Sequence, residues 1–162
     1  LKTAGGPLQG AYRVGLWYDP QPKDRLDGNG TERDDLGLYT SMDQMLLREN
    51  EESDQGLGLF ARFGWTNHEL NAIKSFWSTG LQYRGLVPSR DDDVAGFGVA
   101  QGRLSPESGE FTRKHETIME TFYNVQVAPW LSVAPHIQYV IHPGGADADD
   151  AMVAGVRVQV TF

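Results

Sequence analysis

Apolar and polar residues alternate along most of this chain. Runs with the period-two pattern of a two-faced β-strand cover about 9–19, 35–48, 55–66, 75–87, 93–104, 115–127, 130–142 and 151–162. Each run is close to the about 9–11 residues that cross a bilayer as a tilted strand, whereas ordinary strands average about 5–6. Helical periodicity is scarce, and its best candidate is the short segment 67–77. The pattern therefore predicts an all-β fold of about eight strands.

The connections between these runs alternate in length. Segment 20–35 is long and polar, 49–54 is short and 67–74 is longer, and this order continues to the last connection, 143–150. Up-and-down barrels have this organisation, with loops at one end and tight turns at the other, whereas a soluble Greek key does not require it. We expect an antiparallel up-and-down transmembrane β-barrel.

Parity separates two faces within most runs. In the last run Val156, Val158 and Phe162 share one face, and Arg157 and Gln159 share the other. The runs at 35–48 and 93–104 are ambiguous and are candidates for a bulge. Pro135 lies mid-run on an apolar face, where its missing N–H requires a bulge or a weakened ladder position. The alternation fits either a soluble sandwich with an apolar core or a membrane barrel with an apolar outer surface.

The aromatic residues of the apolar faces favour the membrane barrel. If the C-terminus is periplasmic, the outer strand ends carry Tyr18, Trp65, Trp77 and Tyr139, and the inner ends carry Tyr12, Tyr83, Tyr123 and Phe162. Aromatic rings prefer the two membrane–water interfaces, whereas a sandwich core places its largest rings centrally as often as not. We predict that these side chains form two membrane-interface belts.

Composition narrows the functional classes. The net charge is −8 with no cluster of Lys and Arg, so the sequence does not indicate nucleic-acid binding. No run approaches the about 18 apolar residues of a membrane helix, and cysteine is absent. The chain starts without an initiator Met, a basic segment or an apolar signal segment. We expect that a signal peptide was removed or that this is the C-terminal part of a longer protein.

Five stretches carry a resemblance to a known family. They are "DQMLLRE", "DQGLGLFARFGW", "GLQYRGLVPSRDDDVAGFGVA", "NVQVAPWLSVAPHIQYVIHPGG" and "VAGVRVQVTF", and they run from about Asp43 to Phe162. In order, spacing and residue identity they resemble the carbohydrate-selective porin family, OprB type, of Gram-negative outer membranes. The resemblance implies passive diffusion of glucose and related small sugars through a sixteen-stranded barrel. Residues 1–162 would then be one porin region, the C-terminal half of such a barrel, and the terminal Phe162 would be the signal that the barrel-assembly machinery reads.

The polar faces would line the lumen of this barrel. Sugars present hydroxyl groups and C–H faces, so hydrogen-bonding groups and an aromatic plate suit their selective passage. The predicted lumen contacts are Arg13, Trp17, Arg62, Arg84, Glu120, Asn124 and Gln138, with Arg62, Arg84, Glu120 and Trp17 as first candidates. The alternative is that these residues are ordinary lumen side chains that balance one another's charge.

Other chemistry finds little support. Glu116 and Glu120 share a face, but a strand separates their Cα atoms by roughly 13–14 Å, and glycosidase carboxyls lie about 5–9.5 Å apart. His136 and His142 are too far apart along one strand to share a metal, and the acidic loops lack EF-hand spacing. We predict no enzyme, no cofactor and no metal. The expected partners are small sugars, outer-membrane lipid and the assembly machinery. A soluble lectin-like sandwich or barrel and a barrel-embedded hydrolase remain the alternative functions.

Overall fold

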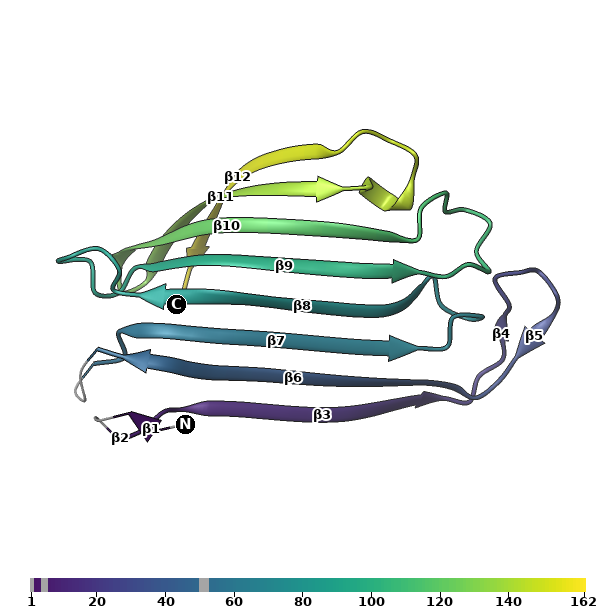
Figure 1. Ribbon diagram of the computed structural model, residues 1–162, viewed down its shortest axis with the longest axis horizontal. Helices are drawn as coiled ribbons and strands as arrows, with labels where there is room; N and C mark the ends of the chain where they lie inside the picture. The colour runs from purple at the N-terminus through teal and green to yellow at the C-terminus, as the bar shows by residue number, and fades with distance from the viewer. Residues whose placement is uncertain (1, 4–5, 50–52) are drawn as a thin grey trace.

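The chain folds into one curved antiparallel sheet of eight strands (Figure 1). A computed structural model describes the chain except for residues 1, 4–5 and 50–52. The sheet contains β3 (Gly10–Asp19), β6 (Asp35–Arg48), β7 (Gly56–Thr66), β8 (Ile73–Arg84), β9 (Val94–Leu104), β10 (His115–Ala128), β11 (Leu131–Ile141) and β12 (Ala151–Val160). Two short pairs lie outside it, β1 (Lys2–Thr3) with β2 (Gly6–Pro7) and β4 (Lys23–Asp24) with β5 (Thr31–Glu32).

Each strand of the sheet pairs with the next one along the chain, which confirms the up-and-down order predicted from the connections. The eight predicted runs coincide with the eight strands, apart from small differences at the ends, the largest at β8, which ends at Arg84. The helical candidate at 67–77 is wrong. Its first residues form a turn in which the Asn71 N–H donates to the Asn67 carbonyl, and the rest continues as β8. The connection over 49–55 lies partly outside the described residues.

The sheet is open. β3 and β12 are its two edges, and no register joins them in the described part of the chain. In Figure 1 the chain ends marked N and C both lie at the end of the sheet that carries the short connections. Each edge presents a row of backbone N–H and C=O groups available for pairing.

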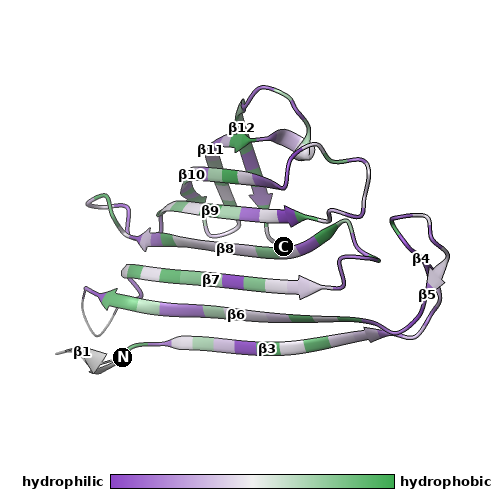
Figure 2. Cartoon of the chain, turned by 45° about the vertical axis from the view of Figure 1, so that its right-hand side comes forward, coloured by the Kyte–Doolittle hydropathy of each residue, from purple (hydrophilic) through white to green (hydrophobic). Residues whose placement is uncertain are grey.

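The apolar face of the sheet has no second layer upon it. Val14 is 81% exposed and Met152 is 75% exposed, and among the described residues the only buried apolar side chains are Leu70 and Leu104. A soluble sandwich would cover this face with a second sheet. Figure 2 shows hydrophobic and hydrophilic residues alternating along the strands. Over the same residues, no helix is long and apolar enough to cross a membrane.

The sheet resolves the two ambiguous runs. The β6 register shifts between Met45 and Leu47, so the predicted bulge is present there. The register of β9 with β10 runs without a shift from Val94 to Arg103, and the shift in its pairing with β8 comes from an extra residue of β8 between Ile73 and Ser75. The bulge considered for β9 is therefore wrong, because the extra residue belongs to its neighbour. The polar face of β9 consists of Val, Gly and Ala residues, and this composition hid its parity.

Pro135 lies where the ladder is weakened, as expected. Its register with β12 is regular, with Pro135 opposite Val156. The register between β11 and β10 stops at His136 and resumes at Val133. Pro135 has no backbone N–H to donate, and the ladder between β10 and β11 is interrupted at this residue.

Candidate functional site

The registers place all seven predicted lumen residues on one face of the sheet. Residues directly opposite one another on neighbouring strands share a face, so the pairing can be followed from edge to edge. The face shared by these seven residues, called the polar face below, also carries Tyr39, Asp43, Phe60, Gln82, Glu116, Phe122, His136, Arg157 and Gln159. The opposite face is called the apolar face.

Asp43 bridges two arginines on the polar face. Its Oδ1 lies 2.7 Å from Arg62 Nη2, and its Oδ2 lies 3.2 Å from Arg13 Nη1. Arg62 Nη1 also donates to the carbonyl of Met42, at 2.7 Å. This cluster joins β3, β6 and β7, and it keeps one positive charge in excess on a solvent-accessible wall. Sequence reasoning missed Asp43, because its strand contains the bulge and its face follows only from the registers with both neighbours.

A second polar group lies on β10 and β11. Gln138 Nε2 donates to Glu120 Oε2 at 2.5 Å, and the two residues are directly opposite in the register. Beside them is a small recess of about 100 Å³ lined by Glu120, Phe122, Asn124, Ser132, Ala134, His136, Arg157 and Gln159. Three of the predicted lumen residues, Glu120, Asn124 and Gln138, therefore lie near one another, and Phe122 lies beside them. Phe122 was not predicted, although its parity follows from that of Glu120.

Two of the predicted residues lie towards opposite ends of the sheet. Trp17 lies near the long-loop end, with the Lys23 ammonium 5.3 Å from the centre of its ring. Arg84 lies at the short-connection end, and its Nη2 is 2.7 Å from Asp92 Oδ1 in the turn that follows. The structure thus brings Arg13 and Arg62 together, and Glu120, Asn124 and Gln138 together, but leaves Trp17 and Arg84 apart from both groups.

Aromatic rings of the polar face lie across glycines of neighbouring strands. A Cβ atom on Gly37 would come within 2.0 Å of Trp17 Nε1, and one on Gly96 within 2.3 Å of Phe122 Cε1. A Cβ on Gly80 would come within 2.6 Å of Phe60 Cε1. The glycines therefore give these rings the space to lie against the sheet. Nothing in the sequence pattern alone connects the two residue types.

Glu116 does not belong to either polar group. Its carboxylate accepts from the Gly144 N–H in the turn η1 (Pro143–Gly145). Glu120 binds Gln138 instead. The two carboxylates therefore hold separate elements, in agreement with the spacing argument against a glycosidase pair.

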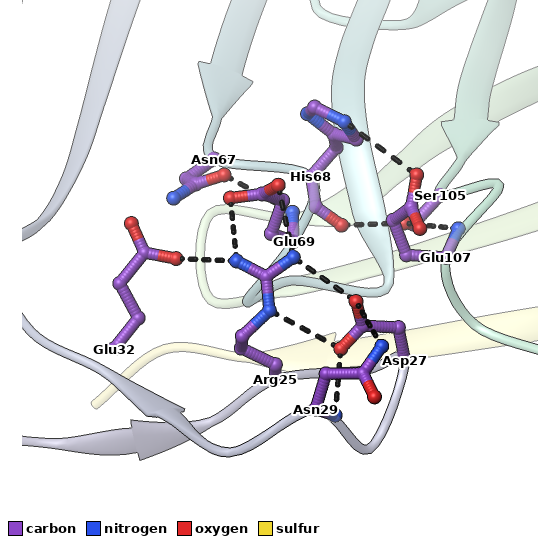
Figure 3. Close-up of polar contacts among 9 residues, drawn as sticks. All are labelled: Arg25, Asp27, Asn29, Glu32, Asn67, His68, Glu69, Ser105 and Glu107. Carbon is purple, nitrogen blue, oxygen red and sulfur yellow. Dashed lines mark hydrogen bonds and ion pairs between the residues drawn. The ribbon is translucent and has the colours of Figure 1, made fainter.

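A clasp of ionic contacts ties the long loops together (Figure 3). Arg25, in the hairpin formed by β4 and β5, donates to Asp27, Glu32 and Glu69, with distances of 3.0 Å to each in its ion pairs. Glu69 belongs to the loop between β7 and β8. The pKa of Arg25 is raised chiefly by its hydrogen bonds to Asp27 and Glu69, and the pKa of Asp27 is lowered chiefly by Arg25. Arg25 and Asp27 are therefore both charged at neutral pH.

Comparison with known proteins decides the family. The sequence model described as carbohydrate-selective porin, OprB family, matches residues 1–162. The chain belongs to this family. Porin B of Pseudomonas aeruginosa is 26% identical over 196 residues, which cover 99% of this chain and 43% of Porin B. The putative porin QuiX of Acinetobacter baylyi is 25% identical over 181 residues, covering 96% of this chain and 41% of QuiX.

Solved structures agree with the OprB assignment. The high-pH structure of Pseudomonas putida OprB superposes with a TM-score of 0.89 at 26% identity, over 96% of this chain and 45% of that chain. The chain thus spans about half the length of the relatives it matches. Membership of this family places the protein in the outer membrane of a Gram-negative bacterium. The resemblance seen in the five sequence stretches is confirmed.

In this OprB-family chain, four tyrosines of the apolar face bind carboxylates near the two ends of the sheet, and the fifth, Tyr12, donates to Gln44. At the long-loop end Tyr139 donates to Asp150 at 2.8 Å, and Tyr18 binds Asp34. At the other end Tyr83 donates to Glu49 at 2.7 Å, and Tyr123 donates to Asp93 at 2.8 Å. A phenol with its hydroxyl at a strand end suits a membrane–water interface, so the belts remain a prediction.

Proposed function

We propose that the full-length protein is an outer-membrane porin that allows passive, carbohydrate-selective diffusion of glucose and related small sugars. The proposal rests on membership of the OprB family together with one observation. The polar face carries donors and acceptors fixed in pairs, Arg62 with Asp43 and Gln138 with Glu120. Groups held in this way exchange hydrogen bonds with sugar hydroxyls without tight binding, which diffusion through a pore needs.

The seven predicted sugar contacts remain proposals, and the geometry ranks them. Arg13, Arg62, Glu120, Asn124 and Gln138 lie in the two polar groups of the wall. Trp17 and Arg84 lie towards the two ends, where they would meet a sugar on entry or exit. The polar face is the lumen wall in this proposal, and the residues act by binding and release, with no catalysis, cofactor or metal.

We also propose that the apolar face contacts outer-membrane lipid, with the tyrosines and tryptophans as its two belts. Trp65 is 41% exposed and Tyr12 is 66% exposed on this face, with no protein layer over them. Unpaired backbone groups find no partner in hydrocarbon, so the edges at β3 and β12 require further strands in the complete barrel. Residues 1–162 are then a single region of a longer barrel. Phe162 is fully exposed, and its recognition by the assembly machinery stays a prediction.

Planar-bilayer conductance of the full-length protein tests the function. We expect glucose to reduce the ionic conductance in a saturable manner, and a non-sugar solute of similar size to reduce it only in proportion to its concentration. Equal and unsaturable effects of both solutes would show a general pore, and the absence of any channel would remove the porin proposal itself.

A further inference from the structure

We propose that Phe60 is a stacking platform for the C–H face of a ring sugar on the lumen wall. This inference rests on the proposed sugar passage and extends it to a residue that neither the sequence motifs nor the comparisons assign. Phe60 is partly exposed on the polar face. Among the described residues, no other ring of this face has a carboxylate on each side of it in its row of opposed residues.

Phe60 occupies the middle of a continuous row of opposed residues. Across the sheet the register runs from Asp43 to Phe60, then through Gly80 and Gly98, and on to Glu120. Gln138 follows Glu120 in the same row. The row thus has a carboxylate with hydrogen-bonding partners on each side of an aromatic ring.

The two glycines decide how the ring lies. A Cβ on Gly80 would be 2.6 Å from Phe60 Cε1, and a Cβ on Gly98 would be 3.2 Å from Phe60 Cζ. The ring therefore leans from β7 across β8 towards β9, over backbone with no side chains. Because Gly80 and Gly98 have no side chains, the row is open between the ring and Glu120. From β8 or β9, which the ring covers, to β10 is one or two strand spacings of about 4.8 Å. A pyranose is of this size.

Arg62 forms a cation–π contact with the ring, with its Cζ over the ring and 5.5 Å from the ring centre. Its guanidinium also donates to the Met42 carbonyl and to Asp43 on the β6 side, while the ring itself extends over Gly80 towards Gly98 on the other side. A sugar lying on the ring would find donors from Arg62 at one edge and acceptors from Glu120 at the other. Apolar C–H faces pack on aromatic faces while hydroxyls at the ring edge bind polar groups.

Phe122 is the nearest comparison on the same face. It also lies against a glycine, Gly96, but His136 and Gly155 follow it in its row, with no carboxylate in those positions. Phe122 thus fills the space above a glycine without a carboxylate beside it, whereas Phe60 has one on each side. Phe60 therefore combines the platform with the hydroxyl-binding groups.

Glucose block of the full-length channel in planar bilayers tests this assignment, with mannitol as a second probe. Mannitol offers similar hydroxyls but no ring face. We expect Phe60→Leu to weaken glucose block about fivefold, the size of one lost aromatic stack, while mannitol block stays unchanged. Phe60→Tyr keeps the ring and should keep the glucose affinity. Phe63→Leu, the same change on the apolar face of the same strand, is the matched control and should affect neither probe.

The outcomes separate this inference from the proposed function. If the unaltered channel shows no saturable glucose block, both the sugar-porin function and the role of Phe60 are wrong. If glucose blocks the unaltered channel and Phe60→Leu equally, or if Phe60→Leu weakens glucose and mannitol alike, only the platform is wrong. Should Phe60→Leu fail to fold, Gly98→Ala provides a second variant, because its Cβ displaces the ring tip and should weaken glucose block selectively.

Discussion

Arg62 and Asp43 form an ion pair between neighbouring strands, with 2.7 Å between Arg62 Nη2 and Asp43 Oδ1, although they are nineteen residues apart in the chain. They are diagonal neighbours in the register, since Arg62 lies opposite Ser41 and Asp43 lies opposite Phe60. The same carboxylate holds Arg13 of β3. One acidic residue therefore sets the charge of this part of the wall, and it does so through a pairing that only the folded sheet creates.

Replacing Asp43 by Asn should make the full-length channel more anion-selective. The change leaves Arg13 and Arg62 without their shared counter-charge, and charged rings or clusters in a pore wall control the sign of the permeant ion. We expect the ratio of chloride to potassium permeability to rise about twofold, measured as the reversal potential in a salt gradient. Stability should change little, because both ion pairs are partly exposed. An unchanged reversal potential would place Asp43 outside the conducting path.

Replacing Glu120 by Ala should weaken glucose block by a factor of about three to ten, the effect of losing one hydrogen-bonding partner. Glu120→Gln should restore part of the affinity, because its amide oxygen still accepts from Gln138 and from a sugar hydroxyl. The measurement is the glucose titration of channel conductance. The matched control is Glu116→Gln, which alters a carboxylate of the same strand that holds the Gly144 turn. A larger effect at Glu116 than at Glu120 would contradict the assignment.

Removing the clasp with Arg25→Gln should loosen the β4–β5 hairpin. Arg25 holds Asp27, Glu32 and Glu69, so its loss frees three carboxylates and separates two loops. We expect amide hydrogen exchange in segment 23–32 to accelerate at least about threefold, while the strands of the sheet remain protected. Arg33→Gln removes the same charge from an exposed side chain of the same loop and should have no comparable effect.

The clasp should also resist mild acid. The pKa values of Asp27 and Glu69 are both lowered, chiefly by Arg25. A carboxyl whose pKa is lower in the folded state stabilises it above the ordinary pKa, and this contribution is lost as the pH falls through the lowered value. Protection of segment 23–32 should therefore persist at about pH 5 and decline below the ordinary values of 4.5 for Glu and 3.8 for Asp. A loss of protection between about pH 7 and pH 5 would contradict this account.

Gly56→Ala should destabilise the sheet at the β6–β7 connection. Gly56 has φ of +143°, and a Cβ there would come within 2.0 Å of the Leu47 carbonyl oxygen. Backbone strain of this kind costs about 1–3 kcal/mol. Gly64→Ala on the same strand is the control, because a Cβ there would lie 3.9 Å from the Leu38 carbonyl oxygen, an ordinary contact, and its φ is not positive. Urea midpoints of the full-length protein refolded in detergent should fall for Gly56→Ala only, and an equal fall for both would exclude the strain at Gly56.

The sequence by itself determined the strands and most of their faces. Alternation is a local property, because successive side chains of a strand point to opposite sides whatever the strand pairs with. Val156 and Arg157, or Phe63 and Arg62, therefore had to lie on different faces. The lengths of the runs and of their connections were also enough for the up-and-down order. Segment 67–77 was a local error, because a single hydrogen-bonded turn there resembles the start of a helix.

The tertiary structure alone decided which residues meet across the sheet. Registers fix such contacts, and a bulge such as that between Met45 and Leu47 shifts them without any clear mark in the sequence. Asp43 was missed for this reason, and the ring of Phe60 gained its significance only when Gly80 and Gly98 were found beside it. Parity follows from the geometry of one strand, but partnership depends on the alignment of several, which is a non-local property of the fold.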